Sequence, residues 1–537
     1  MEEIFDAIII GGGHNGQILA AYLRKAGLST LVLERRMEPG GGLCTEEVTV
    51  PGFYHNLHSF FLRWVPDLPW YRDLELEHFG IRMIMPNVQT VAPYGDGKCL
   101  VFHSDLEKTI KNISYFSEKD ARTYRKLMSL FQEINDKIIT PESYSPPIPF
   151  AEKKALLEKS GLGREYLALS KKSPVALAKD FFESEQMRAM MIFLVTTRMF
   201  LAHEPGLGYN VAAAMIGGLR GSMCKGGSHY LAHGISKFVE THGGKIREAA
   251  HVREIVVEEG CAVGVIMNTG QRIKAAKLIA SSVDVPQTFL ELVGEDNLES
   301  NFVEKIKGFK FSKFPLFGVH LALNEPLHYA AAEFDPDINQ GFNYNIGLEC
   351  LEDYFEHEKE IEAGNPPQKP GMQCAQPTLH DPMQAPAGKH TAFLWQMAPY
   401  HLNKGGAEVW DTIKEDYMEV CLERWRQYAP NLNRDNIIAH YTFTPLDVER
   451  KLINMRYGDH CVGRAHHDQM LDHRPFPELK PYRTPIERLY LCGSSTHPFG
   501  NITGAPGYNA ARVICEDLKL KIWWDPPNPQ TLWSNLQ

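Results

Sequence analysis

The sequence predicts an α/β protein organised around a Rossmann-type dinucleotide-binding domain. An apolar run at residues 6–10 is typical of a buried parallel strand, residues 18–25 indicate a helix, and residues 29–34 form a second strand that ends in Glu34. Between the first strand and the helix, three glycines have the spacing G-x-G-x-x-G; they are Gly11, Gly13 and Gly16. Because strand, glycine turn, helix, second strand and terminal acid occur in this order, the pattern predicts a nucleotide site rather than a structural turn.

Each glycine of this turn has its own physical role. Gly11 permits the tight turn, Gly13 lets a pyrophosphate approach the backbone, and Gly16 lets the helix pack closely on the strand. The helix N-terminus, where His14 and Asn15 stand, offers free N–H groups and a partial positive charge to phosphates. All five residues are therefore predicted cofactor contacts.

The residues after the second strand indicate which dinucleotide is bound. Glu34 follows the first glycine by about 20 residues, where an acid accepts hydrogen bonds from a ribose with a free 2′-hydroxyl, which disfavours NADP. Arg35 and a second glycine loop with Gly41 and Gly42 come next, and that loop supplies further N–H groups beside the pyrophosphate. A cofactor gripped along its length is FAD, so we expect FAD rather than NAD.

Composition and charge restrict the function classes. A formal net charge of −10 over 537 residues argues against a nucleic-acid-binding protein. The ten cysteines include no CxxC pair, which argues against a zinc ribbon or a dithiol centre and suggests reduced thiols. The acidic N-terminus enters a strand at once and does not look like a signal peptide. We therefore expect a cytoplasmic protein.

One apolar helical run, residues 187–203, is short for a membrane span and is interrupted by Arg188 and Arg198. We expect it to be core or pocket wall, and contact with a membrane surface stays open as the alternative.

Residues 33–47, LERRMEPGGGLCTEE, resemble the E-x-R-x-x-P-G-G-x-x-x-T-E segment of the phytoene-desaturase-like flavoproteins. That family includes bacterial phytoene desaturases, carotenoid cis–trans isomerases and one type of carotene ketolase. Residues 97–127, 226–246 and 489–512 resemble further family segments in the same order, so the resemblance covers nearly the whole chain.

The resemblance implies an FAD domain of the glutathione-reductase and amine-oxidase type, interleaved with an α+β substrate domain. The FAD domain would comprise residues 1–53, 228–295 and 489–520. The substrate domain would comprise a helical part at 54–227 and a mixed sheet at 296–488, and residues 521–537 would form a tail. Residues 243–284 would form a small sheet that crosses the FAD domain.

The resemblance also assigns the glycine-rich segment near the C-terminus. Residues 489–492 would be the last parallel strand of the N-terminal sheet, and the following turn and helix would face the flavin. The contacts implied here are Gly493, Gly504, Ala505 and Tyr508. The backbone of Val252 would contact the adenine.

Two histidines are candidates for proton transfer. His58 lies in an aromatic run at residues 51–61 that follows the second glycine loop; a histidine bonded to backbone is the alternative. His497 stands beside the closing glycine turn and is the second candidate. Phe499 and Val462 depart from the ketolase-like pattern, which weighs against carotenoid oxidation itself.

No metal site is predicted. Residues 464–469, RAHHDQ, contain His466 and His467, but adjacent residues of a strand point to opposite faces. Met-rich and aromatic segments, with a proline-rich loop at residues 364–390, would form either an apolar tunnel or ordinary core.

These patterns favour an FAD-dependent oxidoreductase that transfers hydride from an apolar, isoprenoid or polyene, substrate to the flavin. Oxygen or a membrane quinone would then reoxidise it, which leaves a peripheral membrane contact open. The alternatives are a non-redox isomerase or hydratase that uses reduced FAD, and a prenyl-protein chaperone of the Rab escort or GDP-dissociation-inhibitor type. No oligomeric state is predicted.

Overall fold

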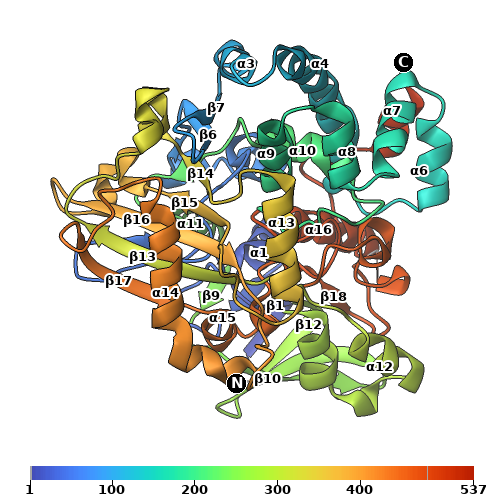
Figure 1. Ribbon diagram of the computed structural model, residues 1–537. Helices are drawn as coiled ribbons and strands as arrows, with labels where there is room; N and C mark the ends of the chain where they lie inside the picture. Colours follow the sequence, from blue (N-terminus) through green and yellow to red (C-terminus); the bar gives the residue numbers. More distant parts are fainter. Residues whose placement is uncertain (1–2, 480–481, 537) are drawn as a thin grey trace.

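The computed structural model describes residues 3–479 and 482–536, and its first sheet is assembled from three separate parts of the chain (Figure 1). The strand order is β10-β11-β12-β1-β2-β9, and β18 pairs with β12. β1 is parallel to β2 and β12, and β18 is parallel to β12, so the expected return of the C-terminal segment to the N-terminal sheet is confirmed. The strands are β1 (Glu3–Ile10), β2 (Thr30–Leu33), β9 (Lys245–Arg247), β10 (Val252–Glu258), β11 (Cys261–Met267), β12 (Arg272–Ser281) and β18 (Leu489–Leu491).

Alternation of side chains along β1 explains how both faces of this sheet are covered. Ala7 and Ile9 pack with the helices on one face, and Ile8 and Ile10 pack with apolar residues on the other. The first face is covered by α1 (His14–Lys25), α11 (His229–Thr241) and α16 (Ala505–Asp517). The second face is covered by residues 287–294 and α12 (Ser300–Lys307).

Residues 243–284 form strands, as the pattern predicts, and these strands are continuous with the parallel sheet. β12 pairs with β11 near its start and with β1 along its length, because it is ten residues long. The antiparallel β10–β11 hairpin therefore extends the parallel sheet.

The second sheet has seven strands in the order β17-β13-β16-β15-β14-β6-β7. β6 and β7 come from the first inserted block, which was expected to be helical, and β6 joins the other block by parallel pairing with β14. One strand, β15, lies inside the proline-rich loop, so part of that loop is regular structure. The strands are β6 (Val88–Pro93), β7 (Cys99–His103), β13 (Leu316–Leu323), β14 (Asn343–Ile346), β15 (Met372–Ala375), β16 (His390–Met397) and β17 (Ile437–Phe443).

A helical layer lies above both sheets in the view of Figure 1. Serine side chains cap several of its helices by accepting hydrogen bonds from backbone N–H groups; Ser184, for example, accepts one from the Met187 N–H. The helices are α3 (Leu106–Ser114), α4 (Glu118–Ile134), α5 (Thr140–Ser143), α6 (Phe150–Leu157), α7 (Gly161–Ser170), α8 (Pro174–Phe181), α9 (Glu185–Thr196), α10 (Tyr209–Gly217) and the C-terminal α17 (Pro529–Ser534).

The apolar run of residues 187–203 is only partly helical. α9 ends at Thr196, and Phe200 then forms a β-bridge with Ala465. Met190 to Val195 are buried, as expected for a core segment. Within the described part of the chain, no helix combines the length and the apolar character that crossing a bilayer demands.

The remaining helices and strands lie between or beside these layers. They are α2 (Pro69–Asp73), α13 (Leu351–Glu362), α14 (Trp410–Arg426), α15 (Pro445–Lys451), β3 (Thr45–Glu46), β4 (His55–Asn56), β5 (Met83–Ile84) and β8 (Met223–Cys224).

Candidate active site

A cavity begins at the carboxyl ends of β1 and β2 and continues to the second sheet. At its first end, the lining comprises Gly11, Gly13, Glu34 and Val252. At its other end, the lining is mostly apolar and aromatic, although Arg63, Thr197 and Gln373 also belong to it; the apolar part includes Phe60, Phe61, Met199, Leu316 and Trp395. Ligand crevices of parallel sheets lie at these strand ends.

Hydrogen bonds from two backbone N–H groups hold the carboxylate of Glu34 in place. Its Oε2 accepts the Gly12 N–H at 2.8 Å, and its Oε1 accepts the Arg36 N–H at 2.8 Å. The side chain is buried, yet it lines the cavity. Each carboxylate oxygen has a further lone pair, so the group can also accept hydrogen bonds from a ligand.

The two glycine loops meet at the cavity. Gly13 forms a β-bridge with Gly40, and a Cβ at Gly41 would stand 3.2 Å from the Gly13 Cα. A Cβ at Gly16 would stand 2.2 Å from the Gly11 carbonyl oxygen, so Gly16 serves helix–strand packing. Gly13 differs, because the nearest protein atom to a Cβ at that position is 4.0 Å away. The open space at Gly13 lies where a pyrophosphate would approach the backbone.

The start of α1 carries polar atoms without protein partners. His14 Nε2 and Asn15 Oδ1 are both buried and have no hydrogen-bond partner, and both residues line the cavity. Burial lowers the pKa of His14 to about 4, so the ring is neutral near pH 7. Because buried polar atoms are normally satisfied, these atoms fit a polar ligand such as a dinucleotide.

The C-terminal glycine turn reaches the same place through different residues from those expected. Ser494 lines the cavity, and its Oγ accepts from Asn15 Nδ2 at 3.3 Å; Asn501 and Ile502 line it as well. A Cβ at Gly493 would stand 2.3 Å from the Ser282 carbonyl oxygen, so Gly493 faces β12.

The other three predicted residues of this segment do not line the cavity and pack against the protein behind the turn. Gly504 has a φ of +65°, and a Cβ there would stand 2.5 Å from Trp70 Nε1. Ala505 is the first residue of α16 and is buried. The Tyr508 ring is packed 5.2 Å from the ring of Tyr22.

The remaining predicted cofactor contacts line the cavity. Arg35 does so while its Nη2 donates to the Lys451 carbonyl oxygen at 2.8 Å, and Gly41, Gly42 and Val252 also belong to the lining. Val252 is the first residue of β10, so the start of the β10–β11 hairpin lies at the first end of the cavity.

The apolar end of the cavity adjoins a second one beside α9 and α13. Both cavities are lined by Thr197, Met199, Leu316, Gln373 and Trp395. Tyr354, Met372 and Met397 extend the apolar lining of the second cavity. The space available to a ligand therefore lengthens away from the glycine loops, among apolar side chains.

His58 lines the cavity, and so does His460, which no sequence motif marks. Neither ring nitrogen of either residue has a hydrogen-bond partner, and the ring centres are 5.9 Å apart. Burial, then the neighbouring His460, lowers the pKa of His58 well below its ordinary value. Burial also lowers the pKa of His460, to about 4. Both rings are therefore neutral near pH 7 and available to a ligand.

His497 is placed elsewhere. Its ring is buried, its Nε2 lies 3.0 Å from the Glu142 carbonyl oxygen, and it does not line the cavity. This contact gives the ring a structural partner on the helical layer.

Known proteins resemble this chain along nearly its whole length. A family model described as an NAD(P)-binding Rossmann-like domain matches residues 9–72. One of the subunits of the limonene dehydrogenase of Castellaniella defragrans is 31% identical, covering 97% of this chain and 96% of that protein. Pyridine nucleotide-disulfide oxidoreductase domain-containing protein 2 of Rattus norvegicus is 30% identical over 96% of this chain and 94% of its own. A lycopene-forming phytoene desaturase of Pseudescherichia vulneris is 24% identical over 95% of this chain and 99% of its own.

Solved structures share the fold. An oxidoreductase from Methanosarcina mazei superposes with a TM-score of 0.59 at 17% identity, over 96% of this chain and 99% of that one. Cyclohexylamine oxidase from Brevibacterium oxydans gives a TM-score of 0.58 at 16% identity, over 96% and 99%. With relatives that match nearly end to end and a dinucleotide cradle at the ends of β1 and β2, the chain belongs to the phytoene-desaturase-like family of oxidoreductases.

Proposed function

We propose that this protein is an FAD-dependent dehydrogenase that oxidises an apolar, isoprenoid-type substrate. The observation that carries the proposal is the continuity of the cavity, which joins a glycine-lined dinucleotide cradle to an aromatic and apolar wall. The names of the relatives, a limonene dehydrogenase and phytoene desaturases, support a substrate of this class.

The cradle residues would hold FAD in a defined direction. Glu34 would accept from the ribose hydroxyls, and the N–H groups at the start of α1 would face the pyrophosphate across Gly13. The hairpin residue Val252 would border the adenine, and Ser494 would border the cofactor from the C-terminal turn. When bound, FAD supplies a hydride acceptor.

The second end of the cavity would bind the substrate by apolar contact. Phe61 packs edge-to-face against both Phe60 and Trp395. These contacts make this wall of the cavity rigid. Burial of a hydrocarbon here is favourable by about 25 cal/mol per Å² of apolar surface. The same wall excludes water from the reacting carbon.

His58 would take up the proton that a dehydrogenation releases. Removing a hydride from one carbon and a proton from its neighbour leaves a carbon–carbon double bond, so a base is required. A neutral imidazole with an unpartnered ring nitrogen can accept that proton. Because burial and the neighbouring His460 lower the pKa of His58, the protonated ring would be a strong acid and would pass the proton on readily.

The two alternatives are less well supported. An isomerase or hydratase would need no electron acceptor, and a prenyl-protein chaperone would need no catalytic base. The relatives' names describe redox enzymes, which favours the dehydrogenase.

Analysis of the cofactor and the product tests the proposal. Protein purified without added cofactor is heat-denatured, the released small molecules are identified by mass spectrometry, and the holoprotein is then incubated with limonene and an artificial electron acceptor. We expect FAD at about one equivalent and a product two hydrogens lighter than the substrate. A product of unchanged mass would indicate isomerisation, and a protein that neither contains nor binds FAD would contradict the proposal.

A further inference from the structure

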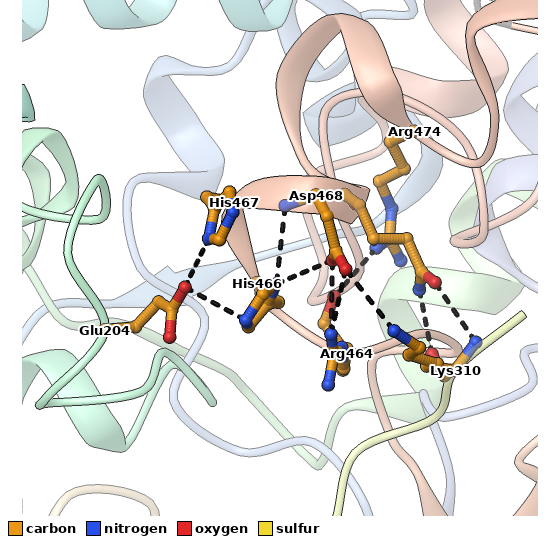
Figure 2. A network of polar contacts seen from close by, with 8 residues as sticks. Glu204, Lys310, Arg464, His466, His467, Asp468 and Arg474 are labelled. Atoms are coloured by element: carbon orange, nitrogen blue, oxygen red, sulfur yellow. Dashed lines mark hydrogen bonds and ion pairs between the residues drawn. The ribbon is translucent and has the colours of Figure 1, made fainter.

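Three side chains with metal-ligating atoms converge where two distant segments of the chain meet. They are Glu204, which follows α9, and His466 and His467, which precede the C-terminal strand. Nε2 of His466 lies 3.0 Å from Oε1 of Glu204, and Nδ1 of His467 contacts the same oxygen. Figure 2 shows both rings directed at this carboxylate. None of the three lines the cavity described above.

The two histidines lie on one side of the chain, contrary to the expectation from strand alternation. Residues 467–469 form a single 3₁₀ turn, and His466 immediately precedes it. Alternation applies only to extended backbone, so the turn brings the two rings to 4.3 Å between their centres. The premise that excluded a metal here is therefore wrong.

Backbone contacts hold together the two segments that carry these ligands. Phe200 and Ala465 form a β-bridge next to the ligands. Gly206 has a φ of +90°, and a Cβ there would stand 3.4 Å from the Cβ of His467. The backbone thus sets the separation of the ligands before any ion binds.

One tautomer of His466 leaves a ring nitrogen free to bind a cation. Its Nδ1 lies 2.6 Å from Oδ1 of Asp468, while its Nε2 faces Glu204. A neutral imidazole has a single N–H. If Nδ1–H donates to Asp468, the Nε2 lone pair faces a carboxylate oxygen, an arrangement that a cation between them stabilises.

Asp468 is placed to orient the ring of His466. Arg464 Nη2 lies 3.0 Å from its Oδ2, and Lys310 Nζ lies 3.4 Å from the same oxygen (Figure 2). These two cations offset its charge, so Glu204 is the anionic ligand. A carboxylate that accepts from the outer nitrogen of a ligating histidine fixes the ring and raises its basicity.

We propose that Glu204, His466 and His467 form a binding site for a divalent transition-metal ion of the zinc type, with Asp468 as a positioning residue. Two imidazoles and one carboxylate are a ligand set that zinc accepts, with a fourth position for water. Ligand atoms about 2.0–2.1 Å from a common ion at tetrahedral or octahedral angles lie roughly 2.9–3.4 Å apart. The 3.0 Å between His466 Nε2 and Glu204 Oε1 falls within that range, whereas His467 Nδ1 lies closer to the same oxygen and would move outward to ligate the ion.

The exposure of the ligands fits a site with a solvent entrance. The side chains of Glu204 and His466 are 16% and 19% exposed, whereas that of His467 is 61% exposed. The inner pair is preorganised, and His467 can close over an ion that enters. Met199 and Val462 line the cavity, and each is a few residues from a segment that carries the ligands. A bound ion would therefore stabilise one wall of that cavity.

Metal titration of tag-free protein tests the site. Protein dialysed against a chelator is titrated with ZnCl₂ by calorimetry, and with CoCl₂ by visible absorption, which reports coordination by nitrogen and oxygen. We expect one equivalent of metal and a thermal midpoint that rises by about 2 °C at a hundredfold excess over Kd.

Variants assign the ligands. Glu204→Gln, His466→Ala and the exposed His467→Ala should abolish the one-equivalent binding, and Asp468→Asn should weaken it by about 10–100-fold. His473→Ala is the matched control, because His473 is an exposed histidine of the same segment, half exposed and outside the cluster. Circular dichroism checks the fold of each variant. Absence of binding to the wild type, or equal binding by the folded His467→Ala and wild-type proteins, would overturn the proposal.

Discussion

The imidazole rings of His58 and His460 lie 5.9 Å apart in the wall of the cavity, and none of their four nitrogens has a hydrogen-bond partner. Buried polar atoms without partners are uncommon in native proteins, and strongly shifted pKa values cluster at functional sites. This pair lines the same cavity as the glycine loops and the aromatic residues. The two rings are therefore our candidates for proton transfer to or from a substrate.

Replacing His58 by alanine should separate chemistry from cofactor binding. We expect His58→Ala to retain FAD and to oxidise substrate about 10²–10⁴ times more slowly, the range for loss of a general acid or base. Single-turnover kinetics with the substrate measure this. The exposed His440→Ala is the control and should match the wild type. An unchanged rate for His58→Ala would assign the ring a structural role.

Replacing Gly13 by valine should remove the cofactor while leaving the fold intact. The backbone at Gly13 has a φ of −64°, which any residue adopts, and the nearest protein atom to an added Cβ is 4.0 Å away. The side chain would then fill the space where a pyrophosphate approaches. Flavin absorbance after purification measures the loss. Gly161→Ala is the control, since its Cβ would meet nothing within 4 Å; a yellow Gly13→Val protein would contradict the cradle.

The buried ion pair of the helical layer should be sensitive to loss of one partner. Lys153 Nζ lies 2.6 Å from Glu142 Oε1, and the side chains are 3% and 7% exposed. Lys153→Met would leave a buried, unpaired carboxylate and should lower the free energy of unfolding by about 3–5 kcal/mol. Urea denaturation measures it. The adjacent Lys154→Met removes an exposed pair with Glu158 and should change the free energy by less than about 1 kcal/mol; equal effects would contradict this account.

Asp284 should make the protein less stable as the pH rises. Burial raises the pKa of its carboxyl to about 7, although the Gln287 N–H and Arg456 act to lower it. The folded state therefore keeps a proton that the unfolded state loses near pH 4, so the free energy of unfolding falls between about pH 4 and pH 7. The slope approaches about 1.4 kcal/mol per pH unit at most.

Asp284→Asn keeps the shape of this side chain and removes the titration. We expect the variant to lose that part of the pH dependence and to be more stable than the wild type at pH 8. Denaturant unfolding at pH 5 and pH 8 measures both. A wild-type protein whose stability relative to Asp284→Asn is the same at both pH values would exclude a raised pKa.

The dinucleotide cradle and the C-terminal strand could be predicted, but on different grounds. Glycine spacing and an acid at a strand end specify a turn and its neighbours without reference to the rest of the fold. The placement of β18 beside β12 followed from a family resemblance, since no local feature of residues 489–491 reports a partner more than 200 residues away. The boundaries of the interleaved domains remain a prediction.

The rest of the site depends on tertiary contacts that no short pattern encodes. His460 has no motif around it, and only the fold brings it to His58. The cavity contact of the C-terminal turn is Ser494 rather than Gly493, because Gly493 is required where the chain passes the backbone of Ser282. His466 and His467 share a side because their segment is a 3₁₀ turn rather than a strand.

We infer that one cavity holds both a flavin and a hydrocarbon, and anaerobic mixing of the purified holoprotein with limonene decides this. We expect the absorbance of oxidised flavin to disappear in the wild type. Leu316→Trp, which narrows the apolar end where the two cavities meet, should retain the flavin and lose the response. A flavin that stays oxidised with limonene and with longer isoprenoids, yet is reduced at once by NADH, would contradict the claim.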